Sequence, residues 1–173
     1  MNIRKANFED TIRAEEIYNE ILDNEAKTVS YTNWKKGLYP TIKTARRAVE
    51  EGTFFVGEEN GIIVGCVNLN SIQPNEYKNI SWNFEAEDDK VLVIHTLCIP
   101  PSQSGKGYGK EFVKFAEEYG EKIGCTVIRL DTYEGNLPAI NFYPRLGYTY
   151  AGVTEFFFEG FIRENLKCFD KKL

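Results

Sequence analysis

The segment PPSQSGKGYGKEF at residues 100–112 contains the residue types of a phosphate-binding loop. Glycines at 105, 107 and 109 alternate with Lys106 and Tyr108, directly before an apolar pattern with helical spacing. Glycine lets the backbone adopt positive φ angles and approach a ligand closely, and the first four N–H groups of a helix have no partner inside the helix. These donors, the partial positive charge of the helix start and the ammonium groups of Lys106 and Lys110 suit a di-anion such as a pyrophosphate. The alternative is a tight strand-to-helix turn in which glycine serves geometry alone.

The spacing excludes two familiar phosphate motifs. A P-loop needs Gly-x-x-x-x-Gly-Lys-Ser/Thr, but Gly109-Lys110 is followed by Glu111, and position 104 holds a serine. A dinucleotide-binding fingerprint needs Gly-x-Gly-x-x-Gly, but the third glycine position after Gly105 and Gly107 is occupied by Lys110. The loop therefore predicts a phosphate ligand bound in another way.

Four side chains are candidates for acid–base or nucleophilic chemistry. His95 is the single histidine and interrupts the apolar segment KVLVIHTLCI at 90–99. An imidazole titrates near ~6.5 and suits a general base; the alternative is a core histidine with satisfied hydrogen bonds. Asp131 and Glu134 are rival bases, for which a structural hydrogen-bond acceptor and a solvated loop charge are the alternatives. Cys98 is the rival nucleophile, although its apolar strand offers nothing that lowers a thiol pKa.

Hydrophobic periodicity predicts the elements that position these residues. Strands are expected at 2–6, 53–59, 61–70, 90–99 and 126–132, with a short one at 79–84, and helices at 7–23, 41–52, 107–123 and 136–146. Asn60-Gly61 predicts a tight hairpin, and two C-terminal strands are expected to join near Glu159-Gly160. The strand–loop–helix–strand unit around the glycines requires a right-handed crossover and a parallel pair.

These elements predict an α+β fold, close to an α/β/α arrangement, in a single domain over residues 1–173. We expect a mixed, mostly antiparallel sheet of six to seven strands, with a central parallel pair and helices on both faces.

The composition argues against several classes of function. The net charge of −5, from 26 acidic and 21 basic residues, disfavours a nucleic-acid-binding protein. No pair among the four cysteines has metal-ligand spacing, so we expect reduced, buried thiols and no metal. The N-terminus MNIRKANFED lacks the apolar region of a signal peptide, and no apolar run approaches membrane-spanning length. We therefore expect a cytoplasmic protein without a membrane partner.

The segment LCIPPSQSGKGYG at 97–109, followed by a helix, the strand IRLDT and then NLPAINFYPRLGY at 136–148, resembles the GNAT family of N-acetyltransferases. The resemblance covers the whole order of elements, and its specific core is residues 91–148. Gly107 and Gly109 match the family's loop pattern Arg/Gln-x-x-Gly-x-Gly/Ala, whereas Ser104 replaces the Arg/Gln residue and Gln103 lies one position early. The resemblance implies that the phosphate is the pyrophosphate of coenzyme A.

The resemblance also implies the acyl-CoA N-acyltransferase fold, in which the strand before the loop carries a bulge and splays from the next parallel strand. The pantetheine arm would pair with backbone groups of that strand, and Asn136 would hydrogen-bond the arm unless it is simply a helix N-cap. Tyr143 would be the general acid at the acetyl sulfur unless it only packs its helix on the sheet. The implied cofactor-binding residues are Leu97, Cys98, Ile99, Ser104, Gly105, Lys106, Gly107, Tyr108, Gly109, Lys110, Asn136 and Tyr143, with Tyr143 and His95 as the catalytic pair.

The function implied is an acetyl-CoA-dependent N-acetyltransferase that acts on a primary amine of a small molecule, amino acid or peptide by direct transfer in a ternary complex. The alternative is a non-catalytic acyl-CoA-binding or regulatory module. The family places the acceptor near segments equivalent to 24–40 and 154–162, whose aromatic residues otherwise belong to the core or to a homodimer face. Those segments offer Tyr31, Trp34, Tyr39, Phe156, Phe157, Phe158 and Phe161, with Glu155 and Glu159.

Overall fold

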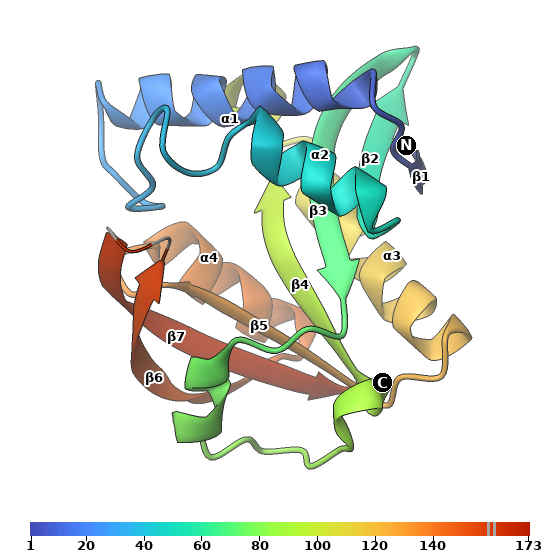
Figure 1. Ribbon diagram of the computed structural model, residues 1–173, viewed down its shortest axis with the longest axis vertical. Coiled ribbons are helices and arrows are strands. Elements are labelled where there is room, and N and C mark those ends of the chain that lie inside the picture. The colour runs from blue at the N-terminus through green and yellow to red at the C-terminus, as the bar shows by residue number, and fades with distance from the viewer. Residues whose placement is uncertain (159, 161) are drawn as a thin grey trace. The chain divides into compact units, whose positions relative to one another are not determined.

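A computed structural model describes residues 1–158, 160 and 162–173 (Figure 1). The strands are β1 (Asn2–Lys5), β2 (Phe54–Glu59), β3 (Ile62–Asn70), β4 (Val91–Cys98), β5 (Val127–Tyr133), β6 (Thr149–Phe158) and β7 (Ile162–Lys172). The α-helices are α1 (Asp10–Glu25), α2 (Ile42–Glu50), α3 (Tyr108–Lys122) and α4 (Leu137–Phe142). Short 3₁₀ helices are η1 (Asn75–Asn79), η2 (Asp88–Lys90), η3 (Pro101–Gln103) and η4 (Tyr143–Leu146).

The strands are hydrogen-bonded in the order β1-β2-β3-β4-β5-β7-β6, which confirms the predicted mixed sheet. The chain divides into two units. The first unit holds Met1–Val29, Trp34–Leu69 and His95–Ala116, and the second holds Ser30–Asn33, Asn70–Ile94 and Glu117–Leu173. Strand β4 and helix α3 each contribute residues to both units.

In the first unit, β1, β2 and β3 form an antiparallel array. The β2–β3 turn has φ angles of 52° at Asn60 and 76° at Gly61, the left-handed pair that a tight hairpin needs, as the sequence predicted. Asn7 starts α1 through two reciprocal bonds, because its Oδ1 accepts from the Asp10 amide at 3.1 Å and its own amide donates to Asp10 Oδ2 at 2.8 Å.

Helices cover both faces of β2 and β3 within this unit. Ile17 and Tyr18 of α1 and Ala45 of α2 pack in one buried cluster with Val56 and Cys66. Side chains alternate between the two faces of a strand, so Gly65, next to Cys66, faces the opposite side of the sheet. There a Cβ on Gly65 would lie 2.8 Å from the ring of Phe112, which shows that α3 packs directly on the strand backbone.

In the second unit, Val91–Ile94 of β4 run parallel to Val127–Leu130 of β5, and the pairs β5–β7 and β6–β7 are antiparallel. Val91, Val93, Val127 and Leu166 form part of a buried cluster with Tyr77 from η1. The parallel pair is the one that the crossover through α3 requires.

The short strand expected at 79–84 is wrong, because buried charged side chains bind this backbone instead of a neighbouring strand. The Phe84 amide donates to Asp170 Oδ2 at 3.0 Å, and its carbonyl accepts from Arg129 Nη2 at 3.0 Å. Asn83 Nδ2 also donates to Asp170 Oδ1 at 2.8 Å. At the predicted C-terminal turn, Gly160 has a φ of 76°, while Glu159 lies outside the described residues.

Candidate active site

The glycine loop of the first unit presents backbone donors ahead of α3. The first amides of the helical ladder are those of Lys110 and Glu111, which donate to the Gly107 carbonyl at 3.0 and 3.3 Å. Gly105 and Gly107 have φ angles of 75° and 85°, and a Cβ on either would meet no atom within 4 Å. The glycines are therefore needed for their conformation, and the open space beside them lets an anion reach the amides of the helix start.

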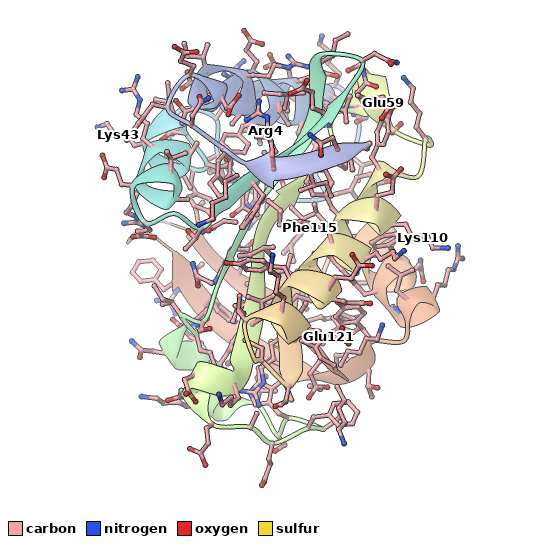
Figure 2. The ribbon with its side chains drawn as sticks, turned by 90° about the vertical axis from the view of Figure 1, so that its right-hand side faces the viewer. Arg4, Lys43, Glu59, Lys110, Phe115 and Glu121 are labelled. Atoms are coloured by element: carbon pink, nitrogen blue, oxygen red, sulfur yellow. The ribbon has the colours of Figure 1, made fainter. Side chains whose placement is uncertain are left out.

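The side chains around the loop supply charge and anchor it. Lys110 is exposed in the first turn of α3, where Figure 2 shows its position at the start of the helix that continues past Phe115 to Glu121. Lys106 Nζ donates to Gln103 Oε1 at 2.8 Å, so Gln103, the residue before Ser104, orients the lysine side chain. The preceding η3 is fixed to α1, because the Ser102 amide donates to Glu20 Oε1 at 2.8 Å. The donor set fits a pyrophosphate in its chemistry.

The strand before the loop changes character after Ile94. Val91–Ile94 are buried, whereas His95, Thr96 and Leu97 are half-buried. Thr96 has a φ of 50°, a left-handed conformation that is an outlier for a β-branched residue. This irregularity turns the backbone at the strand segment where the resemblance predicted a bulge, immediately before Leu97–Ile99.

The sulfhydryl of Cys98 is enclosed. The residue is buried, and burial, followed by the neighbouring Cys66, raises the pKa of its thiol well above the ordinary value. A thiol that resists ionisation is a poor nucleophile.

Tyr39 links the loop after α1 to the irregular part of β4. Its hydroxyl lies 3.2 Å from Thr96 Oγ1, and its ring meets Trp34 edge-on at a centroid distance of 5.9 Å. Trp34 and Tyr39, both predicted for the acceptor side, therefore contact each other, and Tyr39 also contacts Thr96, the residue after His95.

In the second unit, α4 and η4 position Asn136 and Tyr143. Asn136 is an N-cap, because its Oδ1 accepts from the Ala139 amide at 3.2 Å while its Nδ2 donates to Thr132 Oγ1 at 3.0 Å. Tyr143 is buried, with a ring-centroid distance of 5.5 Å to Tyr148 and 6.3 Å to Phe169. The helix-packing contacts of Tyr143 and the capping role of Asn136 are thus present, whatever further role each residue has.

Asp131 lies within β5, one residue beyond the parallel pairing with β4. Its Oδ2 accepts from the Tyr77 hydroxyl at 2.8 Å. Burial raises the pKa of this carboxyl to about 6, although the Tyr77 hydrogen bond lowers it and the charge of Glu164 raises it further. Glu164 is buried and accepts from Asn33 Nδ2 at 2.9 Å. Glu134, by contrast, is exposed and accepts from Asn165 Nδ2 at 3.2 Å.

The predicted acceptor residues on the C-terminal hairpin differ in exposure. Phe156 is buried in the core of the second unit, whereas Phe157 is exposed beneath the Arg163 guanidinium, 5.1 Å from its ring centroid. Glu155 pairs with Arg163 at 2.6 Å. The side chain of Phe158, together with Glu159 and Phe161, lies outside the described part of the chain.

The structure thus collects His95, Leu97, Cys98, Ile99 and the loop 104–110 in the first unit, and Asn136 and Tyr143 at the two ends of α4 in the second. The sequence did not single out Thr96, Tyr77 or Glu164. A threonine in a strand gives no sign of a positive φ, and the partners of Thr96 and Asp131 are 57 and 54 residues away in the chain.

No three His, Cys, Asp or Glu side chains among residues 1–158, 160 and 162–173 gather as a metal site. Within the same ranges, every helix is too short or too polar to span a bilayer.

Comparison with known proteins identifies similar chains. The model of the Acetyltransferase (GNAT) family matches residues 14–148. An uncharacterized N-acetyltransferase of Methanocaldococcus jannaschii is 33% identical over 125 residues, which cover 69% of this chain and 51% of that protein. A streptothricin acetyltransferase of Escherichia coli is 30% identical over 102 residues, 59% of this chain and 48% of that protein. The chain spans about half the length of these curated relatives.

A solved structure shares the fold. The protein yncA from Salmonella typhimurium, determined with its cofactor acetyl-CoA, superimposes with a TM-score of 0.70 at 19% identity, over 100% of this chain and 94% of that one.

Proposed function

The chain belongs to the acetyltransferase (GNAT) family, and on that premise we propose that it is an acetyl-CoA-dependent N-acetyltransferase acting on a primary amine. The observation that carries the proposal is the loop at Gly105–Gly109, where two glycines with positive φ open onto the start of α3. The family match draws on residues of both units, which supports a single functional domain.

The residues that would hold acetyl-CoA come from three segments of the chain. Backbone amides of residues 105–109 would bind the pyrophosphate, with Lys106 and Lys110 adding charge. Main-chain groups of Leu97, Cys98 and Ile99 would pair with the pantetheine arm. Asn136 would hydrogen-bond the same arm through the donor and acceptor positions of its side-chain amide that its N-cap bonds do not use. Ser104 replaces the longer Arg or Gln of the family pattern, so the backbone donors carry more of the affinity here.

Acetyl-CoA supplies an acetyl group activated as a thioester. In the transfer, a bond forms from the amine nitrogen to the acetyl carbon, the carbon–sulfur bond breaks, the amine loses a proton, and the sulfur gains one. A lysine-like amine with a pKa near ~10.4 is protonated at pH 7, and releasing its proton costs roughly 4–5 kcal/mol. A general base at the amine and an acid at the sulfur lower this barrier.

We assign Tyr143 as the acid, since a tyrosine phenol ordinarily holds its proton at neutral pH. His95 is the proposed base because it is half-buried beside the irregular Thr96. Asp131 is the rival base on a specific observation: with a pKa of about 6 its carboxylate is ionised at neutral pH and is basic enough to accept a proton. Replacing each in turn distinguishes them, because only loss of the true base removes the rise of activity with pH.

Direct transfer is favoured over an acetylated enzyme because the Cys98 thiol is buried and its pKa is raised. Mass spectrometry after mixing with acetyl-CoA alone tests this point. An acetyl group trapped on Cys98 would overturn direct transfer.

The acceptor is proposed to be a small molecule, amino acid or peptide with a primary amine. A streptothricin acetyltransferase among the relatives supports including cationic small molecules. A homodimer is a further proposal, supported by exposed Tyr150 and Phe157 on β6, which ends the sheet order; the molar mass in solution tests it.

The test of the function is thiol release from acetyl-CoA with a panel of amines: polyamines, amino acids, aminoglycosides, streptothricin, arylalkylamines and short peptides. Turnover with one class, slowed in Tyr143→Phe, supports the enzyme. Coenzyme A binding without turnover on any amine favours the alternative, a non-catalytic acyl-CoA-binding module. Absence of both binding and turnover in folded protein refutes the proposal.

A further inference from the structure

Strand β4 contains one strained residue in the middle of its candidate catalytic segment. Thr96, with a φ of 50°, stands between His95 and Leu97. The left-handed conformation is unfavourable for a residue with a Cβ and more so for a branched one. Such strain persists only where surrounding contacts hold it in place. The question is which contact holds Thr96.

The side chain of Thr96 lies 3.2 Å from the hydroxyl of Tyr39, both residues belonging to the first unit. Tyr39 is itself firmly held. Its amide donates to the Lys35 carbonyl at 2.9 Å, and its carbonyl accepts from the Lys35 amide at 3.1 Å. Its ring packs edge-on against Trp34. The phenol is therefore presented to β4 from a closed five-residue loop rather than from a free chain.

From this geometry we propose that Tyr39 is a positioning residue: its hydroxyl holds Thr96 in the left-handed conformation and thereby sets the direction of the His95 side chain and of the Leu97 peptide. The inference rests on the proposed function, in which His95 accepts the amine proton and Leu97 offers backbone groups to the acetyl donor. It goes further in giving the loop after α1 control over both groups through one side-chain hydrogen bond.

The mechanism of this control is conformational. A strand residue has a much lower energy at negative φ, so Thr96 without its partner samples ordinary extended states. In those states the peptide after Thr96 rotates, and His95 and Leu97 no longer share one fixed orientation. A misplaced base or donor contact slows the chemical step even when the substrates still bind.

The experiment compares Tyr39→Phe and Thr96→Val, which remove one hydroxyl each and retain the ring or the branched shape, with the double variant. A single hydrogen bond of this kind predicts a loss in kcat of roughly 3- to 10-fold in each single variant. Because both substitutions break the same bond, the double variant is expected to be no slower than either single one. Thr96→Ser, which keeps the hydroxyl, is expected to retain most of the activity.

A matched control and an activity-independent readout separate positioning from general damage. Tyr150→Phe removes a phenol from an exposed tyrosine of β6 and should leave kcat unchanged. In Tyr39→Phe the backbone amides of residues 96–98 should exchange hydrogen faster than in the wild type, while those of Val91–Ile94 keep their rates. Unchanged exchange at 96–98, or additive losses in the double variant, would overturn the inference.

These outcomes distinguish the two proposals. Wild-type protein that acetylates no amine refutes the proposed function, while the exchange rates still decide whether Tyr39 holds Thr96. Wild-type turnover with an equal kcat in Tyr39→Phe refutes the positioning role and leaves the proposed function standing.

Discussion

Replacing Gly107 with alanine isolates the conformational requirement of the phosphate-binding loop. An added Cβ at this position meets no atom within 4 Å, so the substitution creates no steric clash. Its effect comes from the φ angle of 85°, which an L-residue adopts at a cost of about 1–2 kcal/mol. The loop is exposed, so in the free protein the variant can relax to another conformation without losing core contacts.

Coenzyme A must then restore the left-handed conformation, and the cost appears in binding. A penalty of about 1–2 kcal/mol corresponds to a dissociation constant raised about 5- to 30-fold. Calorimetric titration with coenzyme A measures this ratio, and thermal unfolding of the same samples shows that the fold is intact.

Gly61→Ala is the matched control, because Gly61 has a φ of 76° and its Cβ would also meet nothing within 4 Å. It lies in the β2–β3 hairpin, where the chain cannot relax without loss of strand pairing. Here the same penalty should lower the free energy of unfolding and leave coenzyme A affinity unchanged. The reasoning is refuted if Gly107→Ala binds coenzyme A as tightly as the wild type, or if Gly61→Ala weakens binding equally.

Three other substitutions have expected outcomes. Tyr143→Phe keeps the ring contacts of a buried residue, so kcat should fall on the order of 10²-fold with little change in coenzyme A affinity; an unchanged kcat contradicts the acid role. Asp131→Asn removes a carboxyl whose pKa burial raises to about 6, so the charge opposes folding above that pH. The wild type should lose up to about 3 kcal/mol of unfolding free energy relative to the variant as the pH rises from about 4 to above 6. Chemical denaturation at several pH values measures this difference, and a difference between the two proteins that stays constant with pH would contradict the prediction. Gly65→Ala places a Cβ 2.8 Å from the Cys98 carbonyl and from Phe112; it should cost roughly 1–3 kcal/mol of stability, and an unchanged melting temperature would show that α3 can shift.

Local signals explain what the sequence could predict. The order of strands and helices follows from periodicity, and the sharp turns follow from Asn60-Gly61 and from the glycines before α3. Asn136 as a helix N-cap predicted where the helix expected at 136–146 begins, and the cap that starts α4 confirms that start. Each of these depends on residues only a few positions apart, so no knowledge of the tertiary fold is required.

Long-range partners explain what it could not. The segment 79–84 has the composition of a strand, but the buried Arg129 and Asp170 satisfy its backbone and hold it as a loop. The φ angle of Thr96 and the hydrogen bond to Asp131 depend on Tyr39 and Tyr77, which are distant in the chain. Sequence patterns report which residues can be buried, but not which polar partner meets them there.

The most direct test of the central claim is a joint count of products with the wild-type protein and the amine that the panel identifies. Free thiol and acetylated amine are measured from the same reaction, the second by mass spectrometry. The account predicts that they form in a one-to-one ratio and that neither forms without the amine. Thiol release without an acetylated amine, or no product from protein that binds coenzyme A, would contradict it.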